Sequence, residues 1–186
     1  MSLMEKILRA VSGGPTSKPT PPTTPVTIHP PAPATKEAIE AQIDAFLRKV
    51  GVTDPASQTD DKGWRYFQRG SAQGRAGVIK IEEDWHLRVE SPVFPLPGDK
   101  DLLLPLMREL LELNVAIPGS HRVGIDSQQV FAAVTYPLAS LHTGDCAQSI
   151  DSVMALADAL DDYLVDKYGG TSKQRKGQAG ANKKPR

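Results

Sequence analysis

Apolar residues recur at every third or fourth position in three segments of the chain, a spacing typical of helices that bury one face. These segments are 35–51, 101–114 and 145–169. The first starts at Thr35, whose side chain can cap a helix, and ends at Gly51, a residue that tolerates the left-handed backbone of a helix end. The second is so rich in leucine that apolar side chains nearly encircle it. Such a helix needs a covering surface on two sides.

Between these helices the pattern changes to strand-like runs over 64–70, 75–83, 85–91, 121–126 and 128–138. In 85–91, Trp85, Leu87 and Val89 alternate with polar residues, as in a strand with one buried face. We expect the third strand to end before segment 92–99, because its prolines have no amide hydrogen to donate to a sheet. The element order predicts an α+β domain, an antiparallel five-stranded sheet packed with three helices (αβββαββα).

Two flanking segments have a different composition. Residues 15–33 contain eight prolines, which predicts an extended, disordered linker. Before it, residues 3–11 place five apolar side chains on one helical face, either as a fraying end or as a docking motif for a partner or membrane surface. We therefore expect an N-terminal arm over 1–34, a folded domain over 35–170 and a disordered basic tail over 171–186.

Charge separates the same three regions, although the chain carries 22 basic and 22 acidic residues. Residues 36–169 hold 13 basic and 21 acidic side chains, whereas six basic and no acidic residues follow. An acidic domain repels phosphates, so its folded surface is not expected to bind nucleic acid. The tail alone could bind anions, weakly and without specificity, with a log-log salt slope of roughly −5 on duplex DNA at most.

The cellular compartment is predicted from features that the sequence lacks. A single cysteine, Cys146, excludes a disulfide within the chain and is consistent with a reducing cytoplasm. No apolar run approaches the ~20 residues of a membrane-spanning helix, and the first residues lack the apolar region of a secretion signal. We expect a soluble, cytoplasmic protein.

Residues that could carry chemistry do not form a recognisable motif. The glycines of segment 70–77 lie between two strands and lack the spacing of a nucleotide loop. The four histidines have no zinc-ligand spacing, and Cys146 is interpreted as a non-catalytic thiol. Asp158 and Asp162 are one helical turn apart, but nothing supplies a third metal ligand. The sequence therefore predicts no catalytic residue, metal site or cofactor.

Four phrases carry a family resemblance: RGSA (69–72), LRVESPVFPLP (87–97), LLELN (110–114) and LADALDDYLVDKYGG (156–170). In their order and spacing they resemble the YbjN-like family, whose fold is that of the type III secretion chaperones. The resemblance covers about residues 35–170. It implies a small acidic homodimer that binds an extended segment of another protein along apolar patches and has no catalytic centre. YbjN-like members are also described as regulators of sensory transduction.

We accordingly expect a non-enzymatic protein-binding module. Its contact surface is placed on the second face of the sheet, unless helices cover that face, at Phe67, Ile79, Ile81 and Phe131. A dimer interface is expected on the second helix, at Leu102, Leu106 and Leu113. Two alternatives remain open: a ligand-binding domain or enzyme with a cleft near the Pro95–Pro97 loop, and a nucleic-acid accessory protein that acts through its basic tail.

Overall fold

The computed structural model describes residues 3–11, 34–69, 72–141 and 144–169. The proline-rich linker and the basic tail expected from the sequence lie outside these residues. The described elements are α1 (Leu3–Val11), α2 (Lys36–Lys49), η1 (Pro55–Gln58), β1 (Arg65–Arg69), β2 (Ala72–Ile81), β3 (Asp84–Pro95), α3 (Lys100–Ala116), β4 (His121–Asp126), β5 (Gln129–Pro137), η2 (Leu138–Ser140) and α4 (Asp145–Tyr168). The expected α+β class and element order are confirmed, with α1 as an additional helix.

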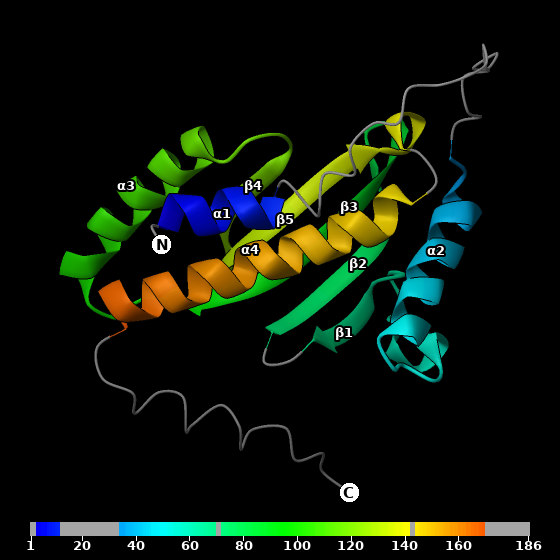
Figure 1. The fold of residues 1–186 in the computed structure, drawn as a ribbon, viewed down its shortest axis with the longest axis horizontal. Helices are drawn as coiled ribbons and strands as arrows, with labels where there is room; N and C mark the ends of the chain where they lie inside the picture. The colour runs from blue at the N-terminus through cyan, green and yellow to red at the C-terminus, as the bar shows by residue number, and fades with distance from the viewer. Residues whose placement is uncertain (1–2, 12–33, 70–71, 142–143, 170–186) are drawn as a thin grey trace, which may run out of the picture.

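The five strands form one antiparallel sheet in the order β1-β2-β3-β5-β4. The longest helix, α4, crosses β2, β3 and β5, and α2 lies beside it over β2 (Figure 1). Helix α1 packs along the other side of α4 (Figure 1). Helix α3 packs against β4, at the edge of the sheet. Figure 1 therefore shows a layer of helices against one face of the sheet.

The core lies between the sheet and this helical layer. Leu87 and Val89 of β3 are fully buried on the face towards the helices, as the alternating pattern predicts. Beneath α4, Phe67 of β1 lies against Gly74 of β2, where a Cβ atom would come within 2.7 Å of the Phe67 ring and 2.8 Å of the Met154 sulfur. Only glycine permits so close an approach, so Gly74 sets the packing distance between α4 and the sheet.

The third strand is longer than the sequence predicts. It was expected to end before Pro92, but β3 continues to Pro95 and pairs with β5 over that length, with a register shift between Pro92 and Phe94. The reason is positional, because β2 pairs with β3 only as far as Glu90. Beyond Glu90, β3 has a strand on one side only. A proline can then turn its missing N–H away from the ladder.

Asn114 was expected to end the second helix, but α3 continues for two residues to Ala116. The Asn114 side-chain amide donates to the Val123 carbonyl at 2.7 Å and accepts from the Val123 amide at 2.8 Å. Val123 belongs to β4, the edge strand of the sheet. Asn114 therefore occupies hydrogen-bonding groups that another strand could otherwise use.

The N-terminal segment forms the amphipathic helix that the sequence predicts, and its docking surface lies on its own domain. Ile7 is fully buried in the core, and Leu3, Met4 and Val11 pack against that core. A helix of nine residues is marginal in water by itself. Its contact with α4 therefore stabilises α1. None of the helices in the described ranges is long and apolar enough to cross a membrane.

Candidate protein-binding surface

The sheet turns one face towards the helices, and the alternation of side chains defines the residues of the other. Arg75, Glu90 and Ala133 lie opposite one another across β2, β3 and β5, and residues two positions apart share their face. Helices α1, α2 and α4 lie on the opposite side (Figure 1). We call this second face the open face; its side chains include Tyr66, Gln73, Arg75, Ile79, Ile81, His86, Arg88, Glu90, Pro92, Phe131 and Thr135.

A charged cluster occupies the middle of the open face. The buried carboxylate of Glu90 accepts hydrogen bonds from the Nε atoms of Arg75, at 2.7 Å, and Arg88. The guanidinium of Arg75 also lies 4.6 Å from the Trp64 ring centroid. Burial by itself lowers the pKa of Arg75, but the bond to Glu90 outweighs this, so its pKa is raised. The cluster carries one net positive charge, and its hydrogen bonds hold both arginines in place.

Apolar and aromatic side chains surround this cluster. Tyr66 and Ile81 are exposed, whereas Ile79 and Phe131 are half-buried. The Tyr66 hydroxyl donates to Asp60 at 3.0 Å, and the Phe131 ring covers Gly124, where a Cβ atom would lie 2.8 Å from the ring. A cavity of about 330 Å³ lies beside Tyr66 and Phe131; its lining consists of Tyr66, Gln73, Gly74, Arg75, Glu90, Pro92, Asp126, Ser127, Gln129 and Phe131.

The structure brings together three of the four residues expected at the contact surface. Ile79, Ile81 and Phe131 lie on the open face, whereas Phe67 points to the opposite face. Phe67 pairs with Gly74 and is buried against α2, with its ring 6.1 Å from that of Phe46 in an edge-to-face arrangement. It is therefore a core residue. A shift of one position along a strand reverses the face, so the neighbouring Tyr66 takes the place expected for Phe67.

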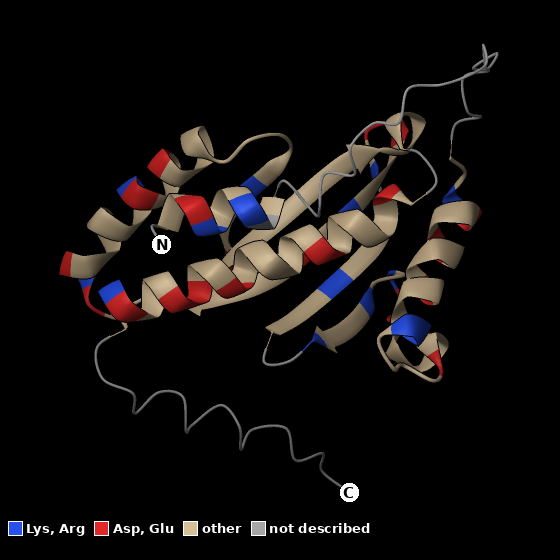
Figure 2. Ribbon diagram, viewed as in Figure 1, with Lys and Arg blue, Asp and Glu red and all other residues tan. Residues whose placement is uncertain are grey.

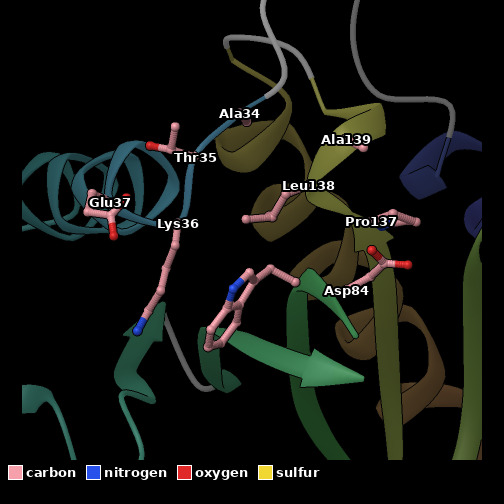
Figure 3. A pocket seen from close by; sticks show the side chains of 9 residues that line it. Ala34, Thr35, Lys36, Glu37, Asp84, Pro137, Leu138 and Ala139 are labelled. Carbon is pink, nitrogen blue, oxygen red and sulfur yellow. The ribbon is translucent and has the colours of Figure 1, made fainter. Parts of the chain in front are cut away.

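A second cavity, of about 640 Å³, lies where α2 begins (Figure 3). Its lining includes Lys36 from α2, Asp84 from β3 and Leu138 from η2. The Lys36 amine lies 4.8 Å from the Trp85 ring centroid. Neither this cavity nor that of the open face is lined by the Pro95–Pro97 loop. These two cavities therefore do not support the alternative of a ligand cleft at that loop.

The residues considered for chemistry lie apart from the open face. Cys146 is fully buried, and burial raises the pKa of its thiol to about 12, although Arg65 acts in the opposite direction. The thiol is therefore protonated at neutral pH and a poor nucleophile. Asp158 and Asp162 are exposed on α4. Within the described ranges, no three His, Cys, Asp or Glu side chains form a group that could hold a metal ion.

Helix α3 differs from the expectation in which leucines face outwards. Leu106 and Leu113 are buried in the core of this chain, where a second copy could not reach them, and only Leu102 of the expected three is exposed. Contact with β4 and α4 fixes this orientation. The outward side instead carries a continuous apolar stripe at spacings of three and four residues. The stripe consists of Leu104, Met107, Leu111 and Val115, which are 75%, 45%, 70% and 90% exposed.

No protein-family model and no curated protein sequence matches the chain significantly. Among solved structures, the chain is similar to one in the ExsC–ExsE complex, with 14% identity, a TM-score of 0.49, and coverage of 69% of this chain and 95% of that one. It is also similar to one in the complex of the Yersinia pestis type III secretion chaperone SycH with a fragment of YscM2, with 16% identity, a TM-score of 0.47, and coverage of 66% and 98%. A third similar chain is in the HopA1–SchA chaperone–effector complex, with 14% identity, a TM-score of 0.48, and coverage of 70% and 99%. Two of the three are described as chaperone complexes. These similarities transfer neither a function nor a partner to this chain.

Proposed function

We propose that this chain is a non-enzymatic protein-binding module that holds a segment of a partner protein on its open face. The observation that carries the proposal is the combination of exposed Tyr66 and Ile81 with a fixed, hydrogen-bonded arginine cluster on a face opposite the helical layer. Aromatic and arginine side chains are the residues that most often anchor protein interfaces. A sheet face that carries both, beside a cavity, is suited to a polypeptide partner.

The residues of the open face also define the chemistry of the partner segment. Its apolar side chains would lie against Tyr66, Ile81 and Phe131. Each arginine has five N–H donors, and their bonds to Glu90 use only some of them. A carbonyl or carboxylate of the partner can accept from the others. Because Glu90 already neutralises one of the two positive charges, we expect apolar contact to contribute more to affinity than charge.

A matched pair of photocrosslinking positions tests this proposal. Tyr66 on the open face and Trp85 near α2 are both aromatic and both 41% exposed. Each is replaced in turn by benzoylphenylalanine in cells that produce the full chain, and the adducts are identified by mass spectrometry. We expect a reproducible set of protein adducts from position 66 that position 85 does not give.

Ile81→Glu in the chain crosslinked from position 66 should abolish these adducts, because it places a charge on the apolar part of the open face. Circular dichroism checks that this variant stays folded. Identical adducts from positions 66 and 85, or adducts that survive Ile81→Glu, would contradict the assignment of the open face. Recovery of nucleic acid in place of protein would favour the alternative of an accessory protein that acts through its tail.

We propose in addition that two copies pair through α3. Its outward stripe is apolar along the whole helix, and contiguous exposed apolar surface usually marks an interaction site. The same surface on a second copy would form a self-complementary, twofold interface. Light scattering at tens of micromolar tests the pairing: Leu111→Glu should give a folded monomer, whereas Leu8→Glu on α1 should leave the dimer unchanged. A monomeric wild-type chain would disprove it. A regulatory role and a cytoplasmic location stay predictions.

A further inference from the structure

Helix α1 is amphipathic and contacts the rest of the domain through its apolar side. Ile7 is fully buried, and Leu3, Met4 and Val11 share its side of the helix at spacings of three and four residues. Lys6 and Arg9 are exposed on the other side. The helix packs along α4, separated in sequence from α2 by residues 12–33, with their eight prolines. Its only covalent connection to the rest of the domain runs through this linker.

The surface beneath α1 lies along the side of α4 that faces α3 (Figure 1). Two hydrogen bonds mark that side: His121 of β4 with Ser152 at 2.8 Å, and Tyr163 with Glu109 of α3. Leu156 lies four residues after Ser152 and seven before Tyr163, so it projects from the same side, and it is fully buried. We call this surface, which α1 covers, the groove. The two bonds that tie α4 to β4 and to α3 on this side do not involve α1.

We propose that this groove, defined by Ser152, Leu156 and Tyr163 of α4 and occupied by α1, is a binding site for an amphipathic helix of a partner protein. Helix α1 is its tethered competitor. Nine residues are too few for a stable isolated helix, so α1 is helical while it contacts the groove and unfolds when it leaves the groove. The linker keeps α1 near the groove at an effective concentration on the order of millimolar. A partner helix therefore binds only if its affinity for the groove is high enough to displace α1.

The charges of α4 and α1 further define the chemistry of the partner helix. Helix α4, against which α1 packs, carries six aspartates and a single lysine; Figure 2 marks the acidic positions in red along its ribbon. Helix α1 itself carries two basic residues and one acidic residue. The occupant is therefore a helix with a net positive charge and apolar residues at positions i, i+3 and i+7, the spacing of Met4, Ile7 and Val11 in α1. This places the site in the class of helix-in-groove recognition.

Binding of a labelled peptide of residues 1–13 to full-length variants tests the competition, with fluorescence anisotropy as the readout. Ile7→Glu introduces a charge at a fully buried position and should release α1 from the groove. Leu8→Glu makes the same change at the adjacent position, which is 44% exposed, and serves as the matched control. We expect the Ile7→Glu chain to bind the peptide about tenfold or more tightly than the wild type, because its tethered competitor is gone. The Leu8→Glu chain should bind like the wild type.

The same peptide with Ile7→Glu should not bind any of these chains. Equal affinity of the wild-type and Ile7→Glu chains, or no binding by either, would overturn the proposal. A wild-type dimer that becomes monomeric with Ile7→Glu but not with Leu8→Glu would show that α1 of a second copy fills the groove, which also overturns the partner-helix assignment. The proposal rests on the protein-binding function only in that its ligand is a protein. Crosslinking reports on the open face and peptide binding on the groove, so either can fail alone.

Discussion

Helices α3 and α4 are both rich in apolar residues, but they bury very different shares of them. In α4, 11 of 24 residues are buried, and the aspartates occupy much of its remaining surface. In α3, only three of 17 residues are buried, and the outward positions are apolar. Helix α4 has the sheet beneath it and neighbouring helices on both flanks, whereas α3 lies at the edge of the sheet against β4. Two helices that are both rich in apolar residues therefore differ: one is largely buried, and the other keeps an exposed apolar stripe.

This difference shows which residues of an apolar-rich helix indicate whether its outer side binds a partner. The polar residues of α4 exclude a further partner from its outer side, because burying an unpaired carboxylate costs several kcal/mol. Helix α3 has no such protection along its stripe. A core helix is thus recognised by where its charges lie, and a helix with apolar residues all round is expected to have a second partner.

The largest expected effect comes from a pair of equal substitutions on opposite sides of α3. Leu106→Glu buries a charge in the core and should unfold the domain, since a loss of more than about 4 kcal/mol is a large part of the stability of a domain this size. Leu111→Glu changes an exposed residue and should alter the stability of the protomer by less than about 0.5 kcal/mol. Urea denaturation followed by circular dichroism measures both. A folded Leu106→Glu monomer would contradict the orientation of α3.

The leucines of α3 also show where sequence reasoning reaches its limit. The spacing of apolar residues locates this helix correctly, but it gives no preference between Leu106 and Leu111, because both belong to an apolar surface that runs all round. Packing against β4 decides between them, and that contact joins segments that sequence periodicity does not relate. The extension of β3 through Pro92 has a similar origin. It depends on where β2 stops, which no local rule contains.

The open face was predicted in part for the same reason. Alternation along β2 and β5 placed Ile79, Ile81 and Phe131 correctly, because those strands are regular. In β1 the choice of Phe67 over Tyr66 reversed the face, and only the pairing with Gly74 resolves it. The arginine–glutamate cluster could not be predicted, since its members come from two strands and meet only through the register of the sheet.

A clamp between the two helices gives the next largest effect. Glu109 of α3 accepts hydrogen bonds from Lys167, at 2.7 Å, and from Tyr163 and Tyr168 of α4. Burial raises the pKa of Glu109, but the three donors outweigh it, so its pKa lies below the ordinary value of 4.5. We expect Glu109→Gln to cost about 2 kcal/mol in urea denaturation at pH 7, because a charged acceptor is lost.

The pH dependence provides the control for this substitution. A carboxylate with a lowered pKa contributes stability that is fully present above pH 4.5 and declines as pH falls further. The difference between wild type and Glu109→Gln should therefore shrink below pH 4.5. A difference that is the same at pH 7 and pH 3.5 would show that the substitution acts through packing and not through the charge.

A smaller effect is expected where α1 packs on α4. Truncating a fully buried isoleucine usually costs 2–5 kcal/mol, but here the loss cannot exceed the free energy with which α1 docks. If the domain stays folded when α1 leaves, Ile7→Ala should cost about 1–2 kcal/mol and lower Tm by several degrees. Leu8→Ala is the control, with a cost of less than about 0.5 kcal/mol. A full cost of 4 kcal/mol would make α1 inseparable from the core, and no change would support the view that the whole N-terminal arm is dispensable.

The smallest effect concerns His121, which joins β4 to Ser152 of α4. The imidazole is buried, and its Nδ1 atom has no hydrogen-bond partner among the residues that the structure describes. Burial lowers the pKa of His121 below its ordinary value of 6.5, and the charge of Arg122 adds to this. The unfolded chain therefore binds a proton at a higher pH than the folded one, so stability is full above pH 6.5 and declines as pH falls towards the lowered pKa. His121→Gln should flatten the curve of unfolding free energy between pH 7 and pH 5, whereas His86→Gln, on the open face, should leave the decline in place. If the decline survives His121→Gln, the buried imidazole is not its cause, and the bond to Ser152 links β4 to α4 without responding to pH.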